Sequence, residues 1–166
     1  MKASSKILRL ALGATLIACG MGASDNPAVG TWKLDLAASK SSTGSLPKSA
    51  TRTVQEQGNG ITVSYEFVES DGSIAKYSYA ASFDDHDVPI SGSGASNWQN
   101  RIDGADMIAM RREGSNTFAE ALKKSGNVVM TARTVVSKKG AVTTITMNGA
   151  DAKGQPTKDV LVWDKQ

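Results

Sequence analysis

The chain has 166 residues, of which 40% are hydrophobic and 21% charged, enough for one domain with a real core. Its formal charge of +3 comes from three basic residues near the N-terminus, and the other 16 of its 19 basic residues balance 16 acidic ones. A neutral domain lacks the positive surface on which nucleic-acid binding depends, so we expect no nucleic-acid partner.

The first 18 residues have the pattern of a signal peptide. Residues 1–9 carry Lys2, Lys6 and Arg9 and no acidic residue, and residues 10–18 are apolar apart from a glycine and a threonine. This stretch has the length of the apolar region of a signal peptide and is too short to cross a bilayer. We therefore expect export.

The apolar stretch ends in Leu16-Ile17-Ala18-Cys19, and Cys19 is the only cysteine of the chain. This tetrapeptide resembles the lipobox of bacterial lipoproteins, in which the cysteine is acylated and becomes the first residue of the mature protein. The resemblance implies a lipid anchor at Cys19. Because Gly20 follows it, the sorting habits of Gram-negative lipoproteins imply the outer membrane, facing the periplasm. Cleavage after Gly22 or Ala23, giving a soluble periplasmic or secreted protein, is the alternative.

After a tether at residues 19–27, we expect one domain over residues 28–166 that consists almost entirely of strands. Short β-prone runs alternate with Gly, Asn and Asp turns at the spacing of an antiparallel sandwich or barrel. Residues 35–42 are predicted as a short helical turn, and residues 41–48 and 84–97 as irregular. The predicted strands cover residues 29–34, 51–57, 61–68, 74–83, 107–112, 117–123, 128–136, 142–147 and 160–163.

Alternation along these strands predicts which side chains face inward. Tyr65 and Phe67 share one side of their strand with aliphatic residues, as Tyr77 and Tyr79 do with alanines, whereas the opposite sides carry Lys, Glu and Ser. Polar outward faces favour a soluble barrel over a membrane barrel. We predict a single antiparallel up-and-down barrel of about 8–10 strands, just wide enough for side chains or one small ligand. The four rings either line a ligand site or fill the core against Met107, Met110 and Trp163.

The segment Gly30-Thr31-Trp32 resembles the Gly-x-Trp opening of lipocalin and fatty-acid-binding-protein barrels. Residues 133–140 and 151–155 extend the likeness, so that residues 27–166 resemble a bacterial family of exported lipocalin-like domains. In such calycin barrels the opening tryptophan closes one end and an arginine from a late strand covers it. The resemblance therefore implies a cation–π contact between Trp32 and Arg133.

No catalytic arrangement of residues is recognisable. The only histidine, His86, lies in Asp84-Asp85-His86-Asp87, which is either a weak cation site or a hydrophilic turn. The run Ser91-Gly92-Ser93-Gly94 lacks the leading glycine of a nucleophile elbow and is predicted as a flexible loop. We expect neither an enzyme nor a bound metal or cofactor.

Two functions remain. The first, implied by the family resemblance, is an envelope lipoprotein whose barrel binds a small hydrophobic ligand. The alternative is a structural or interaction protein of the envelope with a filled barrel. A closed apolar cavity of a few hundred Å³ would favour binding, since small-molecule sites occupy about 300–1,000 Å³.

Overall fold

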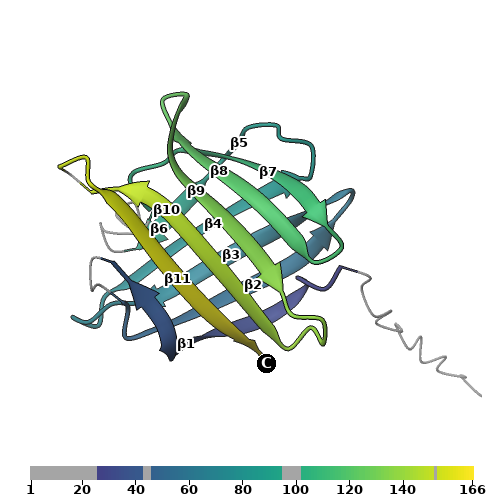
Figure 1. The fold of residues 1–166 in the computed structure, drawn as a ribbon, viewed down its shortest axis with the longest axis horizontal. Coiled ribbons are helices and arrows are strands. Elements are labelled where there is room, and N and C mark those ends of the chain that lie inside the picture. Colours follow the sequence, from purple (N-terminus) through teal and green to yellow (C-terminus); the bar gives the residue numbers. More distant parts are fainter. Residues whose placement is uncertain (1–25, 43–45, 95–101, 152) are drawn as a thin grey trace, which may run out of the picture.

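The computed structural model describes residues 26–42, 46–94, 102–151 and 153–166. They form antiparallel strands in one sheet that curls into a nearly closed barrel (Figure 1). The predicted all-β barrel is therefore confirmed. The strands are β1 (Gly30–Ser41), β2 (Ser49–Gln57), β3 (Gly60–Val68), β4 (Ile74–Ser82), β5 (Val88–Pro89), β6 (Ser91–Gly94), β7 (Met107–Gly114), β8 (Thr117–Lys124), β9 (Asn127–Val136), β10 (Val142–Ala150) and β11 (Pro156–Lys165).

Most strands pair with their neighbours in sequence, as in an up-and-down barrel. The order in the sheet is β5-β7-β8-β9-β10-β11-β1-β2-β3-β4-β6. Pairing of β1 with β11 joins the first strand to the last. The structure has more strands than we predicted because β5 and β6 form within the segment predicted as irregular. No helix among the described residues is long and apolar enough to cross a membrane.

The seam of the barrel lies between β4 and β7. At one end of the seam Asp84 forms an isolated bridge with Arg111, and the Asp85 amide donates to the Met110 carbonyl at 3.0 Å. Further along, β5 pairs with β7, whereas β6 pairs with β4. The two long strands beside the seam are therefore joined through short strands and one bridge, with no continuous ladder between them in the described part of the chain.

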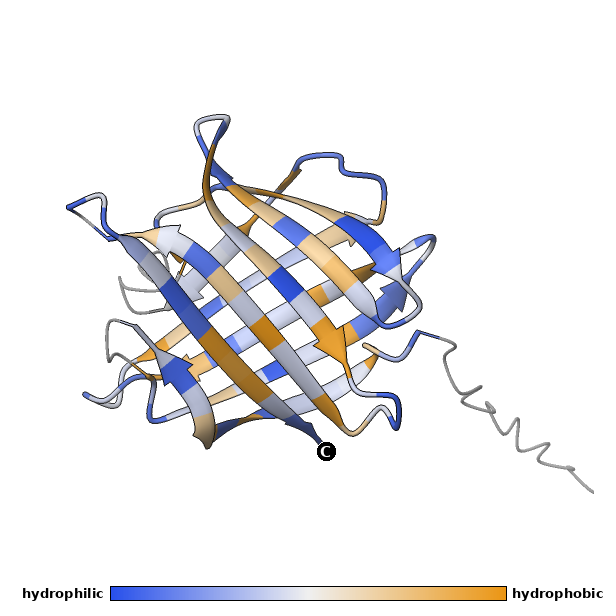
Figure 2. Cartoon of the chain, viewed as in Figure 1, coloured by the Kyte–Doolittle hydropathy of each residue, from blue (hydrophilic) through white to orange (hydrophobic). Residues whose placement is uncertain are grey.

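Each long strand alternates between the core and the outer surface, which gives the barrel its striped pattern of hydropathy (Figure 2). In β3, Val63 and Phe67 are buried, while Ser64 between them is exposed. Burial of one face of each strand removes apolar area from water at roughly 25 cal/mol per Å². This pattern fixes the register, because a one-residue slip would exchange the two faces.

The predicted helical turn at residues 35–42 is wrong. Strand β1 continues to Ser41, with a bulge between Asp35 and Lys40 where its register with β11 shifts. The Asp35 carboxylate accepts hydrogen bonds from the amides of Ala37 and Ala38, at 2.9 and 3.1 Å. These local bonds resemble the start of a helix, but pairing with β11 resumes after them and keeps the segment in the sheet.

Trp32 lies fully buried near the end of the barrel at which β1 starts, and its Nε1 donates to the Ala28 carbonyl at 2.9 Å. The predicted contact with Arg133 is wrong. Arg133 lies on the outer face of β9, because both of its strand neighbours face inward, and its Nε is 3.2 Å from Glu113 Oε2. The cation near Trp32 is Lys165, whose Nζ is 5.2 Å from the ring centroid.

We expect Trp32→Ala to lower the free energy of unfolding by about 3–5 kcal/mol, since a large buried ring is lost. Arg133→Ala should cost less than about 1 kcal/mol, because the Arg133–Glu113 pair is exposed. The losses should add in the double variant, since the two residues share no contact. Denaturant unfolding of the wild type, the two single variants and the double variant tests this. Clear non-additivity would support the Trp32–Arg133 contact that the family resemblance implied.

Candidate functional site

A charged group lies inside the barrel. Arg52 of β2 points inward and is 1% exposed, directly opposite Trp32 of β1 and Tyr65 of β3 in the ladder. Its Nε donates to the Tyr65 hydroxyl at 3.0 Å, and its guanidinium carbon lies 5.7 Å from the centroid of the Tyr65 ring. Because an arginine does not deprotonate in proteins, the interior must hold a full positive charge and therefore needs a partner of opposite sign.

The compensating acid is Glu120, which projects from β8 and is 7% exposed. Four strands, β9, β10, β11 and β1, separate β8 from β2 in the sheet, so Glu120 approaches from another part of the wall. Its Oε1 accepts a hydrogen bond from the Thr134 hydroxyl of β9 at 2.9 Å. The charges of Glu120 and Arg52 act on each other across the interior. Together Arg52, Tyr65, Tyr79, Glu120 and Thr134 form the internal polar cluster.

Burial dominates the acid–base properties of this cluster. It raises the pKa of Glu120, while the charge of Arg52 and hydrogen bonds from Thr134 and Tyr79 oppose the change. Burial also raises the pKa of Tyr79 well above its usual range, and the negative charge of Glu120 adds to the effect. Both tyrosine hydroxyls of the cluster therefore stay neutral and serve as hydrogen-bonding groups.

The aromatic rings of β3 and β4 pack into one stack. Tyr65 and Tyr77, which are cross-strand partners, have centroids 4.7 Å apart, and Phe67 lies 5.8 Å from each. Trp163 of β11 meets Tyr65 edge-on at 5.9 Å. These contacts are the ones expected if the rings fill the core, and each aromatic pair contributes about 0.5–1.5 kcal/mol beyond its area burial.

A small internal cavity of about 20 Å³ lies beside the cluster. Its wall is apolar apart from Glu120 and three tyrosines. It is lined by Tyr65, Tyr77, Tyr79, Ile90, Ile108, Glu120, Leu122, Ala132, Ile145, Met147 and Leu161. Three of the four predicted lining residues are therefore in place, and their contact with a ligand remains a prediction. The fourth, Phe67, is also buried, in the stack with Tyr65 and Tyr77, and is not among the residues that line this cavity.

Several inward-facing side chains bury a polar atom without a hydrogen-bond partner among the described residues. These atoms are Arg52 Nη1, Tyr79 Oη, Thr143 Oγ1 and Trp163 Nε1. Buried polar atoms in folded proteins are nearly always paired, because an unpaired one costs about 1–3 kcal/mol. Of these residues only Tyr79 lines the cavity, whose volume near 20 Å³ accommodates one water molecule. We therefore expect polar atoms of a guest or of water to hydrogen-bond with these groups inside the barrel.

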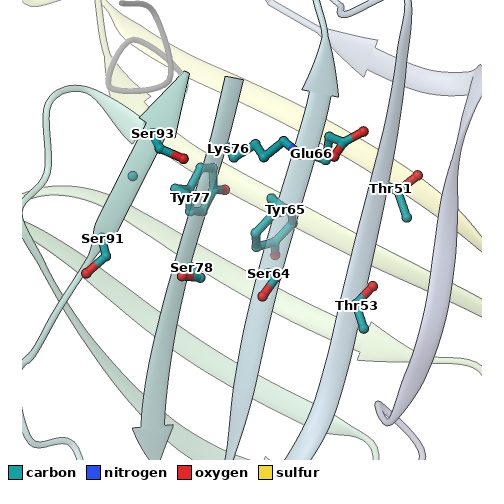
Figure 3. A pocket seen from close by; sticks show the side chains of 11 residues that line it. Thr51, Thr53, Ser64, Tyr65, Glu66, Lys76, Tyr77, Ser78, Ser91 and Ser93 are labelled. Atoms are coloured by element: carbon teal, nitrogen blue, oxygen red, sulfur yellow. Dashed lines mark ion pairs between the residues drawn. The ribbon is translucent and has the colours of Figure 1, made fainter. Parts of the chain in front are cut away.

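A larger hollow of about 590 Å³ lies on the outer face of β2, β3, β4 and β6 (Figure 3). Lys76 and Glu66 form an ion pair of 2.5 Å across it, and both are about half exposed. The other side chains around it are mainly serines and threonines, while the rings of Tyr65 and Tyr77 are buried on the other side of the sheet. The hollow is open to solvent and has no large aliphatic side chain in its wall, unlike a typical small-molecule site.

Two further sequence candidates, His86 and the run Ser91-Gly92-Ser93-Gly94, lie in the described part of the chain. His86 Nδ1 lies 3.2 Å from an oxygen of Asp84, and both are exposed at the seam. Within the described ranges no group of three or more histidine, cysteine, aspartate or glutamate side chains is placed to hold a metal ion. Residues 91–94, predicted as a flexible loop, form β6. Cys19 and the signal peptide lie outside the described residues.

Arg52 and Glu120 are the site residues that sequence reasoning missed. Arg52 alternates with Ala50 and Val54 on the inward side of its strand, and Glu120 alternates in the same way with Phe118 and Leu122. The signal was therefore present as a charge at an inward position of each strand. Polar neighbours in sequence concealed it for Arg52, because Thr51 and Thr53 make the whole segment read as hydrophilic.

The comparisons with known proteins support the fold. No protein-family model matches the sequence, and neither does any curated protein. Among solved structures, the chain is similar to zebrafish ileal bile acid-binding protein in complex with cholic acid, with a TM-score of 0.51. The sequences are 10% identical, and the match covers 84% of this chain and 99% of the zebrafish chain. At this identity the likeness shows only that the two chains share a barrel fold.

The raised pKa of Glu120 predicts how its contribution to stability changes with pH. The folded protein holds this proton more tightly than the unfolded chain, so the contribution is largest at acid pH. It falls as the pH rises from the ordinary carboxyl value of 4.5 through the raised value. We expect the stability of the wild type minus that of Glu120→Gln to fall by up to about 1.4 kcal/mol per pH unit over that interval.

Glu113→Gln provides a control of opposite sign. Hydrogen bonds from Arg111 and Arg133 lower the pKa of the exposed Glu113 carboxyl, so its contribution is lost as the pH falls. Denaturant unfolding over a pH series measures both differences. A Glu120 difference that is constant, or that grows with pH, would contradict the burial argument.

Proposed function

We propose that this protein is a non-enzymatic lipoprotein of the bacterial envelope, anchored through acylated Cys19, whose barrel binds a small, mainly apolar ligand with a polar head group. The observation that carries the binding proposal is a cavity wall that is apolar except for the Glu120 carboxyl and three tyrosines. A few placed polar groups in an apolar wall are what small-molecule sites use to orient a ligand. Likeness in fold to a bile acid-binding protein supports the same general class of ligand.

A ligand larger than water requires the cavity to expand, because about 20 Å³ is far below the usual volume of a ligand site. The seam is the part of the wall best suited to this change. Ile90 and Ile108 line the cavity there, and the strands beside them are joined by short ladders and the Asp84–Arg111 bridge. We therefore expect ligand binding to displace the segment from Asp84 to Gly94. The continuous part of the sheet, which runs from β8 through β11 and β1 to β3, should stay in place.

The alternative function is an interaction protein with a filled barrel. The observation that favours it is the same small volume, together with the close stack of Tyr65, Phe67 and Tyr77. In that case the polar cluster has only a structural role, with one buried water completing its hydrogen bonds.

Titration with a neutral environment-sensitive probe, N-phenyl-1-naphthylamine, distinguishes the two functions. We expect saturable binding to the wild type and at least about tenfold weaker binding to Ala132→Val, because the added methyl groups occupy the cavity wall. Ala80→Val is the matched control, since Ala80 is exposed on the outer face of β4. No saturable binding, and no ligand in native mass spectra of protein purified from its host, would support the filled barrel.

The anchor has its own test. Cys19→Ala should release the protein from the membrane fraction and abolish labelling by a radioactive fatty acid, since lipoprotein processing attaches the acyl chains at this residue. Stable attachment needs more than one acyl chain, which such processing supplies. A wild-type protein that is soluble and unlabelled would instead indicate simple export to the periplasm or medium.

A further inference from the structure

The polar groups that face the internal cavity are not a balanced set. Glu120 supplies the only carboxylate, and no lysine, arginine or histidine lies beside it among the described lining residues. The other polar groups of the wall are the hydroxyls of Tyr65, Tyr77 and Tyr79. A guest therefore meets an acid and three phenols, with no cationic side chain in the wall.

Arg52 is kept away from the guest by Tyr65. Its Nε donates to the Tyr65 hydroxyl at 3.0 Å, and its guanidinium lies 5.7 Å from the ring of the same residue. Tyr65 lines the cavity, whereas Arg52 does not. The charge of Arg52 therefore opposes the rise in the pKa of Glu120 that burial causes, and Arg52 does not itself line the cavity.

On its other side Glu120 meets hydroxyl groups of the internal polar cluster. The Thr134 hydroxyl donates to Oε1 at 2.9 Å, and Thr134 is itself 1% exposed. An ionised carboxylate only accepts hydrogen bonds, and it has room for about four. Its remaining acceptor positions suit a donor from a guest, and such a charge-assisted bond is roughly twice as strong as a neutral one.

We propose that Glu120 selects the head group of the ligand, so that the barrel takes an apolar molecule ending in a hydrogen-bond donor, a hydroxyl or an amine, in preference to a carboxylate. This inference rests on the proposed ligand-binding function. A carboxylate entering the cavity would meet another acid in a medium of low dielectric constant, with no cationic side chain in the described wall to pair with. A hydroxyl or ammonium group would instead donate to Glu120.

The test compares three ligands of equal chain length, decylamine, decanol and decanoate, as competitors of N-phenyl-1-naphthylamine on the full-length protein at neutral pH. We expect decylamine and decanol to displace the probe at about tenfold lower concentration than decanoate, the factor that corresponds to one charge-assisted hydrogen bond. The relative strength of the amine and the alcohol then tells which donor the site prefers. Equal or tighter binding of decanoate would overturn the inference while leaving ligand binding intact.

Glu120→Gln removes the charge and keeps the shape. We expect it to lose at least about tenfold in affinity for decylamine and to gain in affinity for decanoate, because Arg52 is then no longer neutralised. Glu66→Gln, which removes a carboxylate from the outer face of β3, should leave the ranking unchanged. If Glu120→Gln lacks the near-ultraviolet circular dichroism of a folded core, the ranking of the three ligands on the wild type is the test of the inference. An unchanged ranking in folded Glu120→Gln overturns the inference, and failure of the probe to bind any folded form overturns the proposed function with it.

Discussion

Burial of the Arg52 guanidinium is the constraint on which the interior of this barrel depends. A full charge in a core is tolerated only with compensating charge and hydrogen bonds, and these come here from Tyr65 on the next strand and from Glu120 across the barrel. The cluster thereby links parts of the wall that are far apart in the sheet order. It also places polar atoms in a core that could otherwise have been packed entirely with apolar side chains.

The two ends of the barrel differ as a result of where the large side chains lie. At the end where β1 starts, Trp32 is fully buried, and Arg112 lies over the rings of Phe83 and Phe118, 4.8 and 5.2 Å from their centroids. The cavity instead lies beside Ile90 and the seam, where the sheet is joined by short strands. Local opening is expected where backbone ladders are short, so the packing itself indicates the side from which a guest would enter.

Much of the fold follows from the sequence because strand alternation and turn chemistry are local signals. Inward-facing Tyr65 and Tyr79 followed from the parity of their strands, and Gly58 takes the positive φ that a tight turn requires. The errors arose where tertiary pairing decides. Asp35 accepts helix-like local hydrogen bonds but lies within a strand. Arg133 lies on a late strand, as the resemblance implied, but on the outer face of that strand, β9. The centre of the candidate site was missed because a buried charge is recognised only when its partner, far away in sequence, is known.

The density inside the barrel in a high-resolution crystal structure of protein purified from its host tests the central claim most directly. Our account predicts an elongated molecule against Tyr77 and Ile108, with its polar end at Glu120 and Tyr79, and with the segment from Asp84 to Gly94 displaced outward. A single water molecule joining the cluster, with Ile90 and Ile108 in the positions described here, would contradict it and identify the protein as a filled barrel.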